Sequence, residues 1–243
     1  EKADLTVSPQ SLSVSLSRMA KKGKIKMIKR GFGIVLDPGE MFIDPSYYID
    51  ALMKHMGANY YVGLLTAAAR WGAAHQASMV YQVVADKPIS PVELGKGRLQ
   101  VITRTETFPE KGITKVSGVG GYFLVSTPEL TGIDLVRFPK PSGHLNNIAT
   151  ILEDLVEKWN GNKMMAACQE PQIPAATLQR LGYILDNVLN YQREANWIFK
   201  ALKKRNVSSS VLSTVKKKEG MKFKEMEFNE KWKLYINTKI EPD

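Results

Sequence analysis

The sequence holds one cysteine and three histidines, and each scarcity excludes a class of protein. Cys168 has no second thiol, so an internal disulfide and a cysteine-rich zinc site are ruled out. His55, His75 and His144 are far apart in the chain, and we expect neither a metal site nor a metal cofactor. No apolar run approaches the ~20 residues of a membrane-spanning helix. The first residues, Glu-Lys-Ala-Asp, lack the apolar core of a secretion signal, and we expect a cytoplasmic protein with no membrane partner.

The middle of the chain has nearly equal numbers of positive and negative charges, whereas both ends are basic. The 243 residues carry 34 Lys and Arg against 24 Asp and Glu, a net charge of +10, and 44% are hydrophobic, which is enough for a packed core. Residues 1–38 hold eight basic and three acidic residues, residues 196–243 hold twelve and six, and residues 39–195 hold fourteen and fifteen. Two basic ends on a near-neutral body indicate a polyanionic partner for at least one end.

The first element that the sequence predicts is a helix from Pro9 to Lys22. Ser8 is a favoured N-cap, Pro9 suits the first helical position, and Gly23 marks the C-terminus. The face opposite the apolar residues, together with the C-terminal end, carries side chains suited to base edges and phosphates in a major groove: Gln10, Ser11, Ser13, Val14, Arg18, Lys21, Lys22 and Lys24. The alternative is an ordinary solvated surface helix.

Two β-like runs follow this helix, residues 24–28 and 32–36, and predict a hairpin with Lys29 and Arg30 at its tip. A basic hairpin tip after a polar helix is typical of a winged helix, in which the wing lies along a phosphate backbone. A winged helix-turn-helix has two helices ahead of its recognition helix, and seven residues precede Ser8. We therefore expect residues 1–45 to form a partial winged-helix DNA-binding domain, with a plain hairpin as the alternative.

The remaining residues, 46–243, alternate strands and helices without regular βαβ order, which favours an α+β domain. We expect helical segments over 47–75, from Thr127 onward, over 148–167 and over 174–203. We expect strands over 79–85, 99–107, 120–126 and 231–236. A second basic surface is expected near the C-terminus, formed by Lys203, Lys204, Arg205, Lys216, Lys217 and Lys218. This surface suits a second nucleic-acid contact or an acidic partner, and a solvated helix end is the alternative.

Enzyme motifs are incomplete throughout the chain. Residues 95–97, Gly-Lys-Gly, lack the rest of a nucleotide-binding loop, and residues 118–121 lack the dinucleotide spacing and precede a strand. Cys168 stands in an apolar helical stretch, which favours a buried structural thiol over a nucleophile. We therefore expect no enzyme activity and no cofactor.

Four segments, in order along the chain, resemble one known family. They are YVGLLTAAARWGAAHQ (residues 61–76), STPELTGIDLV (126–136), TLQRLGYILDNVL (177–189) and WKLYINTKIEPD (232–243). Together they are similar to segments of the AbiEi-type antitoxins. The resemblance implies a bacterial type IV toxin–antitoxin system that acts in abortive infection. Its antitoxin would be a transcriptional regulator that represses its own operon through a winged helix.

The resemblance also implies a division of labour and partners. Residues 46–243 would form the antitoxin domain, which counters a nucleotidyltransferase-like toxin, and the N-terminal domain would bind an inverted repeat in the duplex DNA of its own promoter. The alternatives are a protein–protein toxin neutraliser, or an RNA-binding protein, without operator binding. A nucleic-acid-processing enzyme is a more distant alternative.

Overall fold

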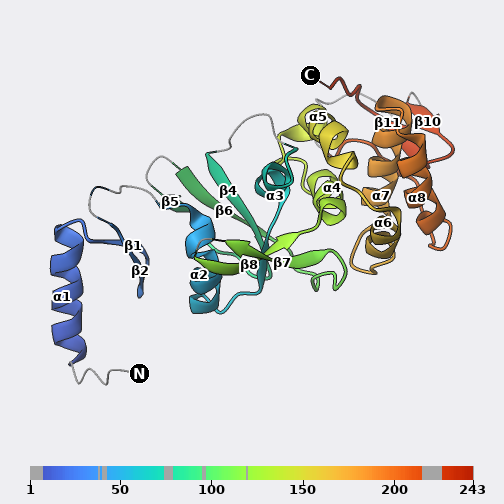
Figure 1. The fold of residues 1–243 in the computed structure, drawn as a ribbon. Coiled ribbons are helices and arrows are strands. Elements are labelled where there is room, and N and C mark those ends of the chain that lie inside the picture. The colour runs from blue at the N-terminus through green and yellow to red at the C-terminus, as the bar shows by residue number, and fades with distance from the viewer. Residues whose placement is uncertain are drawn as a thin grey trace.

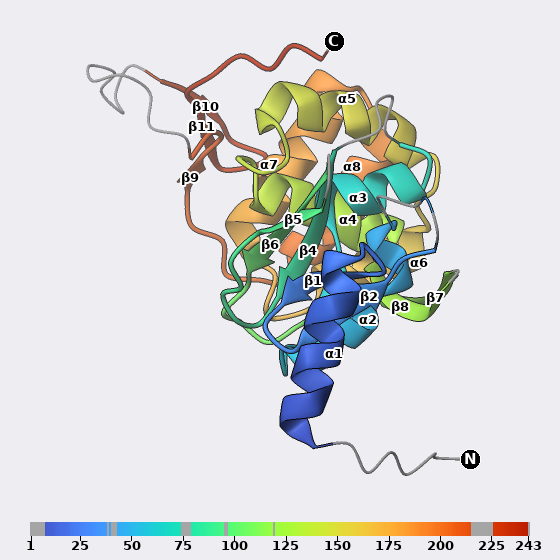
Figure 2. The same ribbon diagram turned by 90° about the vertical axis from the view of Figure 1, so that its left-hand side faces the viewer.

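A computed structural model describes residues 8–37, 39, 43–73, 79–94, 97–118, 120–214 and 226–242. The molecule is elongated, with a helix and a hairpin at the N-terminal end, a twisted sheet in the middle and a group of helices at the other end (Figure 1). Figure 2 looks at the molecule from its N-terminal end, where α1 stands in front of the sheet. None of the described helices has the length and apolarity needed to cross a membrane. The observed fold is mixed α+β, as predicted.

The N-terminal element consists of α1 (Pro9–Lys21), β1 (Ile25–Lys29) and β2 (Phe32–Val35). The Ser8 side chain accepts a hydrogen bond from the backbone N–H of Ser11 at 3.2 Å and so caps the first turn. Gly23 ends the helix with a φ of 68°, a left-handed conformation that favours glycine. β1 and β2 pair antiparallel, with Ile25 opposite Val35. The predicted helix and hairpin are therefore both present.

The central sheet has six described strands in the order β5-β6-β4-β3-β8-β7. Their bounds are β3 (Tyr60–Val62), β4 (Val80–Ala85), β5 (Val92–Leu94), β6 (Gly97–Thr103), β7 (Ile113–Gly118) and β8 (Gly121–Ser126). β4 pairs parallel with β6, and β3 pairs parallel with β8, while the other neighbours are antiparallel. β4, β6 and β8 match predicted strands. β3, β5 and β7 are not among the predicted strands, and β6 ends four residues before the end of the strand predicted over 99–107.

Short helices cover both faces of this sheet. The 3₁₀ helix η1 (Pro45–Tyr47) and α2 (Ile49–His55) pack on one face, and α3 (Leu64–Arg70) packs near α4 (Pro128–Arg137) on the other. The strand period of two separates the faces: Tyr60 and Val62 join the core beneath α2, whereas Tyr61 joins the larger core beneath α4. Tyr61 therefore points toward the C-terminal half of the molecule.

That half is built from α4 (Pro128–Arg137), α5 (His144–Val156), α6 (Gly161–Cys168), α7 (Ala175–Tyr183), the π-helical η2 (Ile184–Val188) and α8 (Gln192–Leu202). A small sheet, β9 (Ser210–Val211), β10 (Glu227–Asn229) and β11 (Leu234–Ile236), has the order β10-β11-β9. The two long helices that we expected are each interrupted. Asn160 caps the new helix α6, and Asn190 reverses the chain before α8 with a φ of 62°.

Candidate functional site

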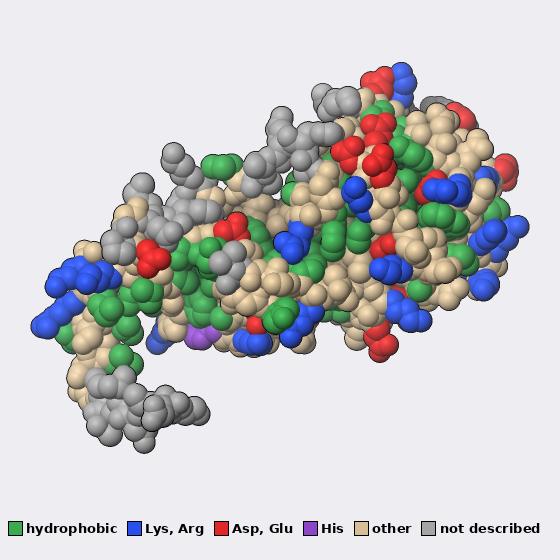
Figure 3. Space-filling view, viewed as in Figure 1, with side chains coloured by type: hydrophobic (Ala, Val, Ile, Leu, Met, Phe, Trp, Pro, Cys, Tyr) green, Lys and Arg blue, Asp and Glu red, His purple; other side chains and the backbone are tan. Residues whose placement is uncertain are grey.

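The predicted DNA-reading residues lie on an exposed helix. Every side chain in this set is exposed: Gln10, Ser11, Ser13, Val14, Arg18, Lys21, Lys22 and Lys24. The cations stand at the C-terminal end of α1, where they also suit the negative end of the helix dipole. Figure 3 shows blue side chains gathered at the N-terminal end of the molecule. We call Arg18, Lys21, Lys22 and Lys24 the N-terminal basic surface.

The two cations of the hairpin tip have different surroundings. The Lys29 Nζ donates a hydrogen bond to the Ser90 carbonyl at 3.1 Å, so this ammonium is turned toward the loop before β5. Arg30 is exposed, and its carbonyl oxygen lies 3.0 Å from the His55 Nε2. The Phe32 ring packs 5.6 Å from the His55 ring. The hairpin is thus anchored on α2, and Arg30 is the tip residue whose charge faces solvent.

The apolar face of α1 is also exposed. Leu12 is 51%, Leu16 is 36% and Met19 is 38% exposed. On the neighbouring hairpin, Met27 is 49% and Val35 is 69% exposed. Within the described residues, this end of the molecule therefore presents apolar side chains next to the N-terminal basic surface, which is a pattern of interaction surfaces.

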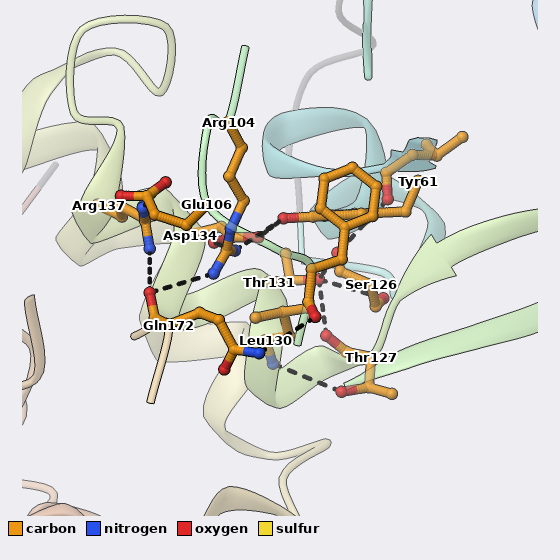
Figure 4. A network of polar contacts seen from close by, with 12 residues as sticks. Tyr61, Arg104, Glu106, Ser126, Thr127, Leu130, Thr131, Asp134, Arg137 and Gln172 are labelled. Carbon is orange, nitrogen blue, oxygen red and sulfur yellow. Dashed lines mark hydrogen bonds and ion pairs between the residues drawn. The ribbon is translucent and has the colours of Figure 1, made fainter. Parts of the chain in front are cut away.

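A buried polar network joins the central sheet to α4 (Figure 4). The Tyr61 hydroxyl donates to the Asp134 Oδ2 at 2.7 Å, and the Arg104 Nη1 lies 3.5 Å from the Asp134 Oδ1. Arg104 also donates to the Gln172 carbonyl at 3.3 Å, and Arg137 donates to the same oxygen at 2.8 Å. These contacts tie β3, the end of β6, α4 and the loop before α7 together.

The network is closed to solvent. The side chains of Arg104 and Asp134 have no exposed area, and Tyr61 is 0% exposed. Burial raises the pKa of Asp134 to about 6, against the opposing effect of the Arg104 guanidinium. The pKa of Tyr61 is raised well above its usual value, mainly by burial and secondly by the nearby Asp134 carboxylate. Because no substrate reaches these groups, the arrangement acts as a structural cross-link.

The sequence pattern does not predict this network, because it places Arg104 within a strand. Residues 99–107 alternate as in a strand, but β6 ends at Thr103. The Arg104 N–H still bonds to the Ala85 carbonyl at 2.8 Å, and its side chain then enters the core beside Asp134. Two charged residues in apolar surroundings are the signal that points to this ion pair: Arg104 directly follows a strand, and Asp134 stands within an apolar helix.

A basic recess lies between the end of α8 and the turn before β11. We call this cavity of about 330 Å³ the C-terminal recess. Four cations line it: Lys203, Arg205, Lys231 and Lys233. Two of these belong to the predicted second basic surface, and the sequence analysis missed the other two because residues 231–236 were interpreted only as a strand. Lys204 is exposed beside the recess, and Lys216, Lys217 and Lys218 lie outside the described residues.

Cys168 occupies the core of the C-terminal half. It is 0% exposed, lies 3.6 Å from the Met164 sulfur, and its pKa is raised by burial to about 12. The prediction of a buried structural thiol is confirmed. His75 lies outside the described residues, and the described part of the chain holds no cluster of three or more potential metal ligands.

The fold and its surfaces define a mixed α+β protein with basic groups at both ends. The family model of the AbiEi antitoxin C-terminal domain matches residues 61–187, which is more than half of the chain. The chain belongs to the AbiEi antitoxin family. Residues 61–187 include the polar network of Tyr61, Arg104 and Asp134, so this cross-link lies in the family's domain.

Solved structures give a further comparison. The RV2827C protein from Mycobacterium tuberculosis superposes with a TM-score of 0.65 at 14% identity, over 93% of this chain and 79% of that chain, and this likeness shows the fold. An antigenic nucleotidyltransferase-like protein from Paracoccidioides brasiliensis has a TM-score of 0.36 at 11% identity, over 64% of this chain and 90% of that chain, a match too weak to carry an argument. No curated protein matches the chain.

Proposed function

We propose that this chain is the antitoxin of a type IV toxin–antitoxin system and that it represses its own promoter. Its family membership supports the antitoxin role. The observation that carries the DNA-binding role is α1, whose polar face is exposed and whose exposed cations stand at its C-terminal end. In this proposal the chain catalyses no reaction and counters a nucleotidyltransferase-like toxin.

The dimensions of α1 suit a recognition helix. Its 13 residues span about 20 Å, and an α-helix fits the major groove of B-DNA. Gln10 and Ser11 offer short donors and acceptors for base edges, and Arg18 and Lys21 would meet phosphates near the other end. The hairpin then acts as the wing, with Arg30 as its main phosphate contact because Lys29 is held by Ser90.

Promoter binding is tested by fluorescence anisotropy on the duplex upstream of the gene. We expect Arg18→Gln with Lys21→Gln to weaken binding and to flatten the salt dependence by about 0.9 per lost phosphate contact. Lys140→Gln with Lys158→Gln removes the same charge from exposed positions elsewhere and is the matched control. Gln10→Ala should instead change base preference at defined positions. Equal binding of operator and random duplex by all variants would contradict the proposal.

We also propose that residues 1–45 are the DNA-binding domain, a partial winged helix, and that residues 46–243 are the antitoxin domain. The boundary is not free of contacts, because Ile28 is 7% exposed and joins the core that includes Tyr48 and Ile49. A fragment of residues 46–243 should still protect cells from a co-expressed toxin while promoter repression is lost. If the folded fragment fails to protect, neutralisation requires the N-terminal element.

A second candidate function follows from the exposed apolar side chains of α1 and the hairpin. Exposed Leu12, Val14, Met27 and Val35 favour a protein interface, and the N-terminal element would then bind the toxin without operator binding. Leu12→Ser distinguishes the two functions. If the N-terminal element binds the toxin, this substitution removes protection of cells against the toxin. Salt-dependent binding of the promoter by the wild-type chain would exclude this alternative. An RNA-binding protein without operator contact is the remaining alternative.

A further inference from the structure

The C-terminal recess gathers charge far from α1, at the other end of the elongated molecule (Figure 1). Lys203 and Arg205 reach it from the end of α8, and Lys231 and Lys233 reach it from the turn before β11. The lining includes one carboxylate, Glu230. The recess therefore brings four cations from two distant segments of the chain to one concavity of about 330 Å³, a size typical of small ligand sites.

Aromatic rings contact two of these four cations, Lys203 and Lys231. The Lys203 Nζ lies 5.0 Å from the centre of the Phe199 ring, and the Lys231 Nζ lies 5.5 Å from it. Lys231 also stands 5.3 Å from the Trp232 ring, and its Nζ pairs with Asp186 at 2.8 Å. Trp232 is 1% exposed and cannot stack on a base. Phe199 also lines the recess and is half-buried, and its ring already contacts Lys203, Lys231 and the Trp232 ring.

Most donors of these cations remain available. The Lys233 Nζ uses one N–H on the Val207 carbonyl at 3.2 Å, and the Arg205 Nη1 uses one on the Cys168 carbonyl at 3.3 Å. An ammonium has three N–H donors and a guanidinium has five, so each group keeps spare donors. Among the ion pairs of the described residues, none joins Lys203 to a carboxylate.

We propose that the C-terminal recess binds the phosphodiester backbone of a single-stranded nucleic acid. A phosphate accepts hydrogen bonds from several converging donors, which matches a guanidinium fork with ammonium groups beside it. Lys200 and Lys204, exposed on the same end of α8, continue the positive charge beyond the recess and suit a ligand with repeating anions. A duplex presents its phosphates on a stiff convex surface, whereas a flexible single strand can enter a concavity.

The interaction should depend on charge and little on base identity, because the Trp232 ring is buried and the Phe199 ring is already in contact with two ammonium groups. RNA and DNA strands share the phosphodiester chemistry, so both are used as probes. An acidic protein segment would use the same cations with carboxylates, and it is the rival occupant. The inference does not rest on promoter binding by α1.

The test is fluorescence anisotropy of the full chain with labelled oligouridine RNA and oligothymidine DNA of about 12 nucleotides. Lys203→Gln with Lys233→Gln removes two exposed cations, and Lys140→Gln with Lys158→Gln is again the matched control. We expect the recess variant to lose about threefold to thirtyfold in affinity and its salt slope to fall by about 1.4, since each phosphate contact to a single strand contributes ~0.7. Thermal unfolding of both variants verifies that they are folded.

The outcomes separate this inference from the proposed promoter binding. Loss of single-strand affinity in the recess variant alone, with the Arg18→Gln, Lys21→Gln variant unaffected, supports the inference. Equal affinities of RNA and DNA also support it, because they assign recognition to the backbone. The inference is overturned if the recess variant and the control variant bind the strands with equal affinity. It is also overturned if a poly-glutamate peptide, added at the same concentration of negative charge as the strand, displaces the strand from the protein. In either of those cases promoter binding by α1 is unaffected.

Discussion

Removing the guanidinium of Arg104 should destabilise the protein in a way that depends on pH. In the wild-type chain, Arg104 lies 3.5 Å from the fully buried carboxylate of Asp134. Arg104→Met keeps the apolar stem and leaves that carboxylate with the Tyr61 hydroxyl as its hydrogen-bond donor. Loss of one partner of a buried ion pair costs about 3–5 kcal/mol, because the remaining charge is left uncompensated.

The sign of the pH dependence follows from Asp134. Its folded pKa, about 6, lies above the ordinary value of 3.8, so ionisation of this group opposes folding and its effect on stability grows more unfavourable as pH rises from about 4 to 6. Without the Arg104 guanidinium, the pKa of Asp134 in the folded protein rises further. Stability then continues to fall with increasing pH up to a higher pH than in the wild-type chain. Urea unfolding should therefore show a larger loss for Arg104→Met near pH 8 than near pH 5, where Asp134 binds a proton. A loss that is equal at both pH values, or below about 1 kcal/mol at pH 8, would refute this reasoning.

Three further predictions concern the C-terminal half. Gly182→Ala should lower the melting temperature, because an added Cβ would lie 2.0 Å from the Trp232 ring, and overpacking costs about 1–3 kcal/mol. Arg180→Gln should cost about 1–3 kcal/mol in chemical unfolding, because the Arg180 Nε donates to the Val211 carbonyl at 2.8 Å; unchanged stability with lost toxin protection would instead place Arg180 in an interface. Native Cys168 should react with a thiol reagent only after unfolding, since it is buried and its pKa is raised to about 12; rapid labelling of the folded protein would contradict this.

Local signals predicted the elements that carry strong local chemistry. Ser8 and Thr127 cap their helices as expected, each followed by Pro at the first helical position. Gly182 allows the close approach of another element, and the structure identifies that element as Trp232. A guanidinium on this helix suits a carboxylate partner, but the Arg180 Nε donates to the Val211 carbonyl of the same chain. These features could be predicted because the residues that determine them are adjacent or lie on one helix face.

The features that were missed depend on residues far apart in the chain. β3 consists of Tyr and Val, which are common in strands, but it is three residues long and too short to show a period of two. Its pairing with β4 and β8, which lie far away in the chain, makes it a strand. The C-terminal recess joins residues near 203 to residues near 231, and the charge count alone could not bring them together. The pairing of Arg104 with Asp134 spans 30 positions and depends on the termination of β6 at Thr103.

The N-terminal element shows how pattern and packing can disagree. Leu12, Leu16 and Met19 form an apolar stripe typical of a helix that packs on a core, yet Leu12 is 51% and Leu16 36% exposed. The hairpin after α1 does contribute to a core, through Ile28 at 7% exposure. Within the described residues, then, the hairpin anchors the element and α1 extends from it, presenting polar, basic and apolar side chains together. Further burial of α1 requires contact with a surface outside the described residues, and for that reason we expect substitutions on its exposed face to change binding with little effect on the stability of the described fold.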